Sequence, residues 1–332
     1  MRKSAEFSLT VILAFFVMIA APTVGFGQQT PAGGEQNGPK ADIKMQGGDQ
    51  VVEQVNVIDE MIGNIDWENN VVYAVGDGVP PKDAISPAQA RVRSKRAAID
   101  EGYGRLLEMV NQVRVDAESL TRNFVNENRV VRTKVSGLVK NAEIMKLRHF
   151  EDGSFQIKMK MPLLGAGGLS SAVYPVHAEN VRKVGIAHEV SREGSIPAKS
   201  TPPKVKKSGQ SSLNKTETEA TYTGLIIDAR GLNGKPSLYP KILSANGKVV
   251  YDITIADPNA TIEEGLTAYR KSLDAAKSLK RLGSNPLVVK ASKISGKYQA
   301  DFVVSKEDTE RILAANAQEN FLNDAKVAVV LE

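Results

Sequence analysis

The residues that could do chemistry in this chain are few and scattered. Asp228 and Arg230 lie two positions apart at the end of an apolar run, where a carboxylate and a guanidinium could act together in a hydrolase. Asp66 and Glu68 share one face of a predicted strand, about 7 Å apart by the rise of an extended chain. That separation is compatible with the carboxylate pair of a glycosidase. For both pairs the simpler interpretation is structural: an ion pair that holds a loop, and a solvent-facing strand.

The histidines and serines follow none of the common catalytic patterns. His149, His177 and His188 lack the spacing of zinc hydrolases, and no GxSxG elbow surrounds Ser170 or Ser171. The chain contains no cysteine, which removes thiol catalysis, thiolate metal sites and disulfides. The sequence therefore predicts no catalytic, cofactor-binding or metal-binding residue, and no cofactor.

Two features could bind an anion. Residues 165–168 form a glycine-rich stretch, but the Lys-Ser/Thr of a phosphate-binding loop does not follow it. We expect a turn there that ends a domain. A basic cluster lies in the first half of a predicted helix and consists of Arg91, Arg93, Lys95 and Arg96. Because a helix N-terminus disfavours positive charge, a solvated face or a subunit contact is the favoured interpretation.

The N-terminal half of the chain predicts one long helix on a small sheet. Alternating apolar residues over 65–75 predict a hairpin. Ser86 as N-cap and Pro87 at the first helical position predict the start of a helix that runs to Val113. Its predicted buried stripe is Ala88, Val92, Ile99, Tyr103, Leu106, Val110 and Val113.

Further strands are predicted after this helix. Residues 130–138 and 142–148 look extended, and 155–161 alternates after the turn signal Asp152-Gly153. Residues 116–128 are ambiguous, with a second short helix as one interpretation. Residues 51–57 fit either a first strand or a short helical segment.

A second set of elements is predicted toward the C-terminus. Strands are expected over 225–229, 239–244 and 248–255, a hairpin over 287–304 and a last strand over 326–331. One helix is expected from Thr261 to Gly283, with Ile262, Leu266, Tyr269, Leu273 and Ala276 as its buried stripe, and another from Ser305 to Asn320. The predicted fold class is α+β, with two small domains that each pack a helix on a small, mainly antiparallel sheet.

The N-terminus has the layout of a secretory signal peptide. Two basic residues precede an apolar run over 9–21, which is shorter than the roughly 20 residues of a membrane-spanning helix. Pro22 and the small residues up to Gly27 provide a cleavage site. We expect residues 1–27 to be removed and the protein to be periplasmic or secreted, with outer-membrane association compatible with this. An uncleaved N-terminal anchor is the alternative.

Composition sets the remaining boundaries and the expected partners. Residues 28–50 read as a disordered leader, 51–168 as a first domain, 169–219 as a basic connector rich in Pro, Lys and Ser, and 220–332 as a second domain. Residues 181–217 carry eight basic and three acidic residues, so the charge excess lies in the connector. This distribution does not fit a nucleic-acid partner. A weak contact with anionic cell-wall or outer-membrane material is compatible with it.

Residues 65–163, about a third of the chain, resemble a family of bacterial envelope proteins. The family includes the twenty-kilodalton outer-membrane lipoproteins and the N-terminal module of flagellar assembly protein T, with flagellar protein P as a relative. The resemblance rests on Val75-Gly76-Asp77-Gly78, on the helix 88–113 with Arg96-Ala97-Ala98 and residues 103–108, on residues 137–143, and on Asp152-Gly153 with residues 157–163. Unlike the lipoproteins, this chain lacks a lipidated cysteine.

The resemblance implies a building block without an active site. Some members assemble into rings or discs around the flagellar rod, so we expect a non-enzymatic exported protein with a structural or assembly role. Its expected partners are other copies of itself or other envelope proteins. A binding module for cell-wall or outer-membrane components is the first alternative, and an uncharacterised hydrolase the second.

Overall fold

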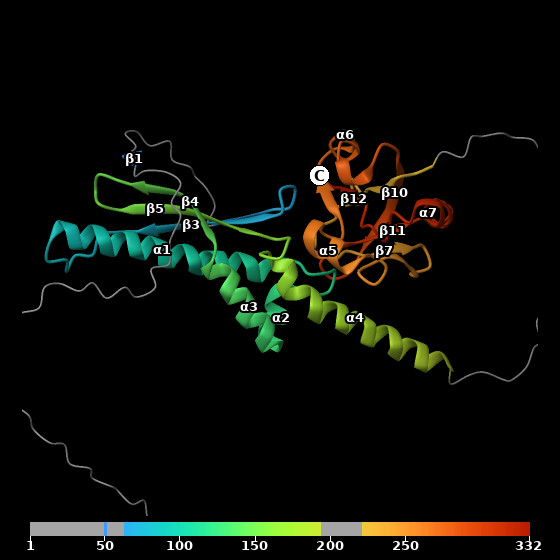
Figure 1. The fold of residues 1–332 in the computed structure, drawn as a ribbon, viewed down its shortest axis with the longest axis horizontal. Coiled ribbons are helices and arrows are strands. Elements are labelled where there is room, and N and C mark those ends of the chain that lie inside the picture. Colours follow the sequence, from blue (N-terminus) through green and yellow to red (C-terminus); the bar gives the residue numbers. More distant parts are fainter. Residues whose placement is uncertain (1–49, 52–62, 194–220) are drawn as a thin grey trace, which may run out of the picture. The chain divides into compact units, whose positions relative to one another are not determined.

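A computed structural model describes residues 50–51, 63–193 and 221–332 (Figure 1). The predicted signal peptide, the leader up to residue 49 and residues 194–220 of the predicted connector lie outside the described residues. The described strands form two sheets, and helices accompany both, which confirms the α+β class.

The first sheet has the order β1-β4-β5-β3-β2. Its strands are β1 (Gln50–Val51), β2 (Gly63–Asp66), β3 (Val71–Gly78), β4 (Glu143–His149) and β5 (Phe155–Pro162). The predicted hairpins are confirmed, because β2 pairs antiparallel with β3, and β4 with β5. β3 and β5 pair over their full lengths in the centre, and the short β1 pairs parallel with β4. Helix α1 (Pro87–Gln112) runs along one face of this sheet (Figure 1).

Helix α1 approaches β3 unusually closely because glycines face small residues. A Cβ atom at Gly76 would overlap the carbonyl oxygen of Ala98, and one at Gly78 would overlap that of Ser94. Ser94 is buried there, and its hydroxyl donates to the Gly78 carbonyl oxygen at 2.6 Å. The helix therefore presents Ser94, Ala98 and Gly102 to the strand. This corrects the predicted stripe, since Ala88 and Val92 are exposed.

A polar network fastens the same helix to the same strand. Arg105 donates to the carbonyl oxygen of Val75 at 2.7 Å and to the carboxylate of Asp77 at 2.9 Å. Its other amino group contacts Glu101 at 2.6 Å, and Glu101 accepts the backbone N–H of Asp77 at 2.8 Å. The Gly-Asp-Gly segment of the envelope-family resemblance thus has a structural role in this fold.

Residues 129–140 form a helix, not the predicted strand. Helix α2 (Thr121–Glu127) confirms the short-helix interpretation of 116–128, and α3 (Arg129–Lys140) follows it directly. Asn128 caps α3, because its side chain accepts the N–H groups of Val130 and Val131. The buried valines recur every four residues, at Val131, Val135 and Val139. Their β-branched side chains resemble a strand composition, but their spacing is that of a buried helix face.

The second sheet has the order β8-β7-β11-β10-β6-β12-β9. Its strands are β6 (Gly224–Asp228), β7 (Ile242–Ser244), β8 (Val249–Tyr251), β9 (Ala268–Arg270), β10 (Pro286–Ser295), β11 (Asp301–Val304) and β12 (Val327–Val330). Among these strands, only the β10–β11 hairpin and the β7–β8 pair are antiparallel. The prediction of a mainly antiparallel sheet is therefore wrong here. The central strands β6 and β12 are almost entirely buried apolar segments, which is typical of parallel strands covered on both faces.

The single helix predicted over 261–283 is broken into shorter elements. They are α5 (Pro258–Glu264), strand β9, α6 (Leu273–Lys277) and the 3₁₀ turn η1 (Lys280–Leu282). Gly265 has φ of 84°, a left-handed conformation that ends α5, and Ser272 caps α6. Helix α7 (Lys306–Glu319) begins after Ser305 as predicted.

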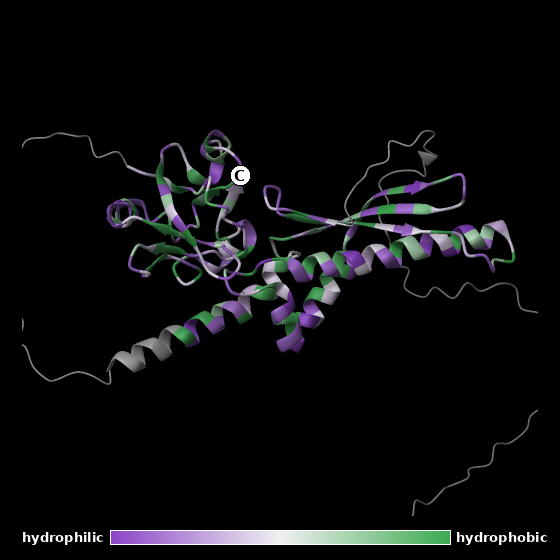
Figure 2. Cartoon of the chain, turned by 180° about the vertical axis from the view of Figure 1, so that it is seen from behind, coloured by the Kyte–Doolittle hydropathy of each residue, from purple (hydrophilic) through white to green (hydrophobic). Residues whose placement is uncertain are grey.

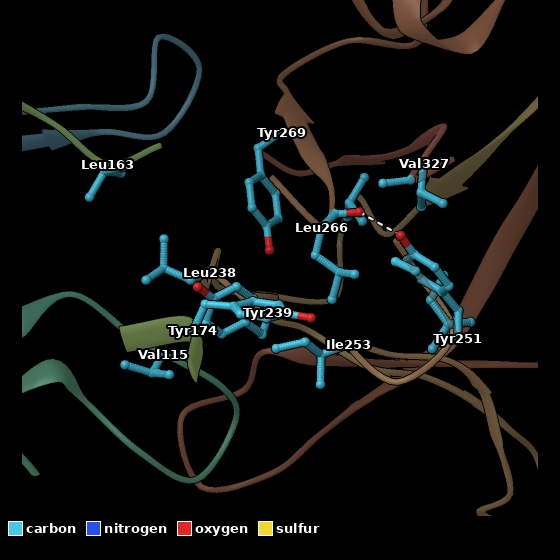
Figure 3. Packing of buried hydrophobic residues seen from close by; sticks show 14 of the residues in the cluster. Val115, Leu163, Tyr174, Leu238, Tyr239, Tyr251, Ile253, Leu266, Tyr269 and Val327 are labelled. Atoms are coloured by element: carbon cyan, nitrogen blue, oxygen red, sulfur yellow. Dashed lines mark hydrogen bonds between the residues drawn. The ribbon is translucent and has the colours of Figure 1, made fainter. Parts of the chain in front are cut away.

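Helix α4 (Leu169–Glu193) occupies the first half of the predicted connector. Its first turns are buried in a hydrophobic core that contains residues from both sheets, and Figure 3 shows part of this core around Tyr174, Tyr239 and Tyr269. The carbonyl oxygen of Ile262 in α5 accepts the N–H of Gly165 and the hydroxyl of Ser170. The two predicted domains therefore share one core.

We expect the close α1–β3 packing to be the most substitution-sensitive contact of the first sheet. Gly76→Ala should lower the free energy of unfolding by about 1–3 kcal/mol or more, because a methyl group has no space beside Ala98. Urea denaturation measures this change. Gly104→Ala is the matched control in α1, where a Cβ atom meets nothing within 4 Å, and it should stabilise by about 0.5–1 kcal/mol. Equal effects of the two substitutions would contradict this interpretation.

Candidate functional site

The predicted Asp228–Arg230 pair forms, and the two side chains hydrogen-bond to each other. It lies at the carboxyl end of β6, and Arg230 donates to both carboxylate oxygens of Asp228, at 2.8 and 2.7 Å. These hydrogen bonds lower the pKa of the Asp228 carboxyl. The backbone N–H of Arg230 also faces Asp228 at 3.3 Å, and Gly231 follows with φ of 79°. The pair holds the turn after β6, which is the structural alternative that the sequence offered.

The second candidate pair, Asp66 and Glu68, belongs to the turn between β2 and β3. Asp66 accepts the N–H groups of Glu68 and Asn69 at 3.1 and 3.0 Å, and the side-chain amide of Asn69 at 2.8 Å. Partial burial raises the pKa of Asp66, but these hydrogen bonds outweigh it and lower the pKa overall. Glu68 lies 3.9 Å from the Lys271 ammonium. The turn therefore accounts for the Asp66 carboxylate, and the ion pair with Lys271 for that of Glu68.

The glycine-rich segment and its serines also have internal partners. The N–H of Gly168 donates to the carbonyl oxygen of Gly165 at 2.9 Å, so the segment is the predicted turn. The Ser170 hydroxyl donates to Ile262, and the Ser171 hydroxyl to the carbonyl oxygen of Gly168 at 2.8 Å.

The three histidines lie in different surroundings. His149 ends β4 and its ring packs against Phe155, with ring centres 4.5 Å apart. The side chain of His188 lies outside the described residues. His177 in α4 is only 3% exposed and stacks on Tyr239, with ring centres 5.1 Å apart and an interplanar angle of 12°.

His177 belongs to a buried polar cluster that sequence reasoning did not find. Its Nδ1 lies 3.5 Å from the Asp116 carboxylate, and the edge of Phe124 contacts its ring. Burial lowers the pKa of His177, opposed by Asp116, so the imidazole is neutral at neutral pH. Asp116 also accepts the N–H groups of Glu118 and Ser119. No local spacing signals this cluster, because its members are far apart in the chain.

Backbone hydrogen bonds surround the cluster and join the two halves of the described chain. The N–H groups of Leu238 and Tyr239 donate to the carbonyl oxygens of Arg114 and Val115, at 2.9 and 2.8 Å. We call this region, residues 113–120 with 237–241 and His177, the junction. Most of its residues are buried or half-buried, and its backbone pairing suits a structural role.

A second carboxylate beside the junction has an altered pKa. Asp301 accepts the backbone N–H of Lys241 at 2.8 Å. Burial raises its pKa to about 6, helped by the negative charges of Asp116 and Glu118. Asp301 and His177 thus respond to acid in opposite directions.

A candidate site is a groove beside edge strand β8. It has a volume of about 480 Å³ and lies between the β7–β8 turn and α7. Two exposed apolar residues contribute to it, Val249 with 47% and Leu313 with 51% of their surface accessible. Lys306 and Glu310 on α7 lie 4.0 Å apart at the groove. An apolar groove along a sheet edge suits an extended polypeptide strand.

A second groove, of about 450 Å³, lies where the β2–β3 turn meets β9. Trp67 contacts the ring edge of Tyr269, with centres 5.8 Å apart. Arg270 donates to the carbonyl oxygen of Glu68 at 3.1 Å. These contacts already join the turn to the second sheet.

The described residues contain no cluster of three or more His, Cys, Asp or Glu arranged to hold a metal ion. None of the helices within the described ranges is long and apolar enough to cross a membrane.

Comparison with known proteins assigns part of the chain. Residues 224–332, from β6 onward, match the family described as Treponema pallidum Tp0624, second domain. No curated protein matches the chain. The family match covers a third of the chain, so the second sheet with its helices is similar to a domain of that protein.

We expect the stability contributed by His177 to fall in acid. The pKa of His177 in the folded protein lies below 6.5, the ordinary value in the unfolded chain. As the pH falls through 6.5, the unfolded chain therefore binds a proton before the folded chain does, and this proton uptake favours unfolding. The stability cost of His177→Gln should therefore be smaller at about pH 5 than at about pH 7.5. Urea denaturation at both pH values measures it. An equal cost at both would contradict burial of a neutral imidazole.

Asp301 should show the opposite dependence. Its folded pKa of about 6 exceeds the ordinary 3.8, so its contribution is fully present below about pH 4 and is lost as the pH rises through 6. Asp301→Asn should therefore cost more at about pH 4 than at about pH 7.5, by on the order of 2–3 kcal/mol. The same denaturation series measures it, with Asp324→Asn, a more exposed carboxylate whose pKa is lowered, as control.

Proposed function

We propose that this chain is a non-enzymatic, exported envelope protein with a structural or assembly role. Folded copies would associate with one another or with other envelope proteins. The resemblance of residues 65–163 and the N-terminal signal-like segment support the location. The edge strand β8 and its groove support the mode of association.

Strand β8 is the observation that carries this proposal. It ends the second sheet, and among the described strands it pairs with β7 alone. A terminal strand has backbone N–H and C=O groups available on its outer side, where another strand can add. Val249 and Leu313 would lose exposed apolar surface in the same contact.

A repeated contact of this kind fits a ring or disc. If β8 of one copy meets a different surface of the next copy, the contact is heterologous, and a closed rotation then gives a ring. A flagellum-associated ring or disc is the specific assembly that the family resemblance suggests, and it is part of the proposal.

A binding module for cell-wall or outer-membrane components is the second candidate. The excess of five positive charges over residues 181–217 favours it. A pull-down on isolated cell wall that is lost when Lys204, Lys206 and Lys207 are replaced would support this alternative. A hydrolase is less favoured, since Asp228 is held by Arg230.

We expect the chain from Gln28 to form discrete oligomers in light scattering across a concentration series. Val249→Lys should shift the oligomers toward monomer, because a lysine on an edge strand opposes strand pairing. Val249 is 47% exposed, so the fold should tolerate the change. Val130→Lys, at an exposed position of α3, is the matched control and should leave the mass unchanged.

Two results would count against the proposal. One is a monomer at every concentration that also recovers no envelope protein in crosslinking. The other is an oligomer whose mass Val249→Lys leaves unchanged, which would remove β8 from the contact.

A further inference from the structure

The most exposed large apolar residues of the described chain gather around the start of α1. Ile85 has 90%, Val79 73% and Val92 69% of its surface accessible. Single exposed apolar residues need no explanation, but three in one short stretch indicate an interaction surface. Figure 2 shows hydrophobic colour beside hydrophilic colour at this end of α1.

Hydrogen bonds and an ion pair hold the β3–α1 loop against the helix. Gly78, next to Val79, accepts the Ser94 hydroxyl, and Asp83 lies 3.1 Å from the Arg93 guanidinium. The N–H of Ile85 donates to the Gln89 side chain at 2.8 Å. We call the loop and the first turns of α1, residues 79–96, the α1 patch.

The tight packing of α1 explains why the patch is apolar and exposed. Ser94 and Ala98 occupy the side of the helix that touches β3. Val92 and Arg96, one turn apart, lie on a different side, where both are exposed. Val92 continues the apolar periodicity of α1 but has no core to enter.

The α1 patch is also strongly basic. Residues 79–96 contain five basic residues and one acidic residue, Asp83, which Arg93 pairs. The Lys82 side chain is exposed, and that of Arg96 is 83% exposed with Asp100 at 3.8 Å. The surface thus combines apolar side chains with a net charge of +4.

We propose that the α1 patch binds an anionic phospholipid membrane surface. Its basic residues are complementary to lipid phosphates, and Ile85, Val79 and Val92 can enter the boundary between headgroups and acyl chains. Such binding lies on the membrane surface and needs no spanning helix. The inference rests on the proposed exported location and adds a surface distinct from β8.

Vesicle sedimentation tests this inference. The chain from Gln28 is used, because the apolar run over 9–21 would itself enter a bilayer. We expect it to bind phosphatidylcholine vesicles that contain about one third phosphatidylglycerol, and to bind pure phosphatidylcholine much more weakly.

Substitutions separate this patch from the basic segment 181–217. Ile85→Ser with Val92→Ser leaves the charge unchanged and should weaken binding by about tenfold or more. Lys82→Gln with Arg96→Gln should weaken binding to the anionic vesicles selectively. Val130→Ser, at an exposed apolar position of α3, is the matched control and should bind like the wild type. In a chain with Lys204, Lys206 and Lys207 changed to Gln, the loss caused by the serine pair should persist.

Three results would overturn the inference. The first is failure of the wild-type chain to bind anionic vesicles, and the second is unchanged binding when Ile85 and Val92 are both replaced by serine. The third is a change in oligomer mass caused by the same double substitution, which would make the patch a protein interface. Light scattering of Val249→Lys reports separately on assembly, so failure of membrane binding and failure of the proposed assembly are distinguishable.

Discussion

The close approach of α1 to β3 is the constraint on which much of this structure depends. Gly76 and Gly78 remove the side chains that would separate helix from strand, and Ser94, Ala98 and Gly102 do the same on the helix. Two backbones in such contact leave little freedom for the helix to slide or rotate. The direction of α1 is thereby set, and with it the position of the chain that follows Gln112.

The chain after α1 leads directly into the junction. Arg114 and Val115 offer their carbonyl oxygens to residues from the second half of the chain, and Asp116 lies beside the buried ring of His177. Helix α4 completes this region with Tyr174, whose ring meets the edge of Tyr239. The tyrosines fill a large volume, and hydrogen bonds serve several of their hydroxyls, as between Tyr251 and the carbonyl oxygen of Leu266. Buried aromatic packing and backbone pairing together make one unit from two sheets.

The same packing decides which surfaces are left for partners. A helix held by small residues turns its larger apolar residue Val92 outward, beside basic side chains. At one edge of the second sheet, β8 has β7 as its described partner, and a groove lies between the β7–β8 turn and α7. One surface is apolar and basic, the other is a strand edge, and the two suit different kinds of partner. Both surfaces would serve the structural role in the cell envelope that we propose.

Features that depend on neighbouring residues could be predicted from the sequence. Ser86 with Pro87, the turn at Asp152-Gly153 and the alternation over 155–161 each act within a few residues, so α1 and the hairpins of the first sheet were predictable. It also indicated the Asp228–Arg230 pair, whose partners are two positions apart. The helix over 129–140 was missed because β-branched valines favour strands when isolated.

The mainly parallel pairing of the second sheet, the shared core and the exposure of Val92 depend on contacts between distant parts of the chain. The strand β9 forms because Gly265 stops a helix and β12 offers an edge, although local propensity favours a continuing helix. The junction joins Val115 to Tyr239 and Asp116 to His177, pairs that no local spacing connects. Each of these contacts closes a long loop, and its energy appears only when the rest of the core is assembled.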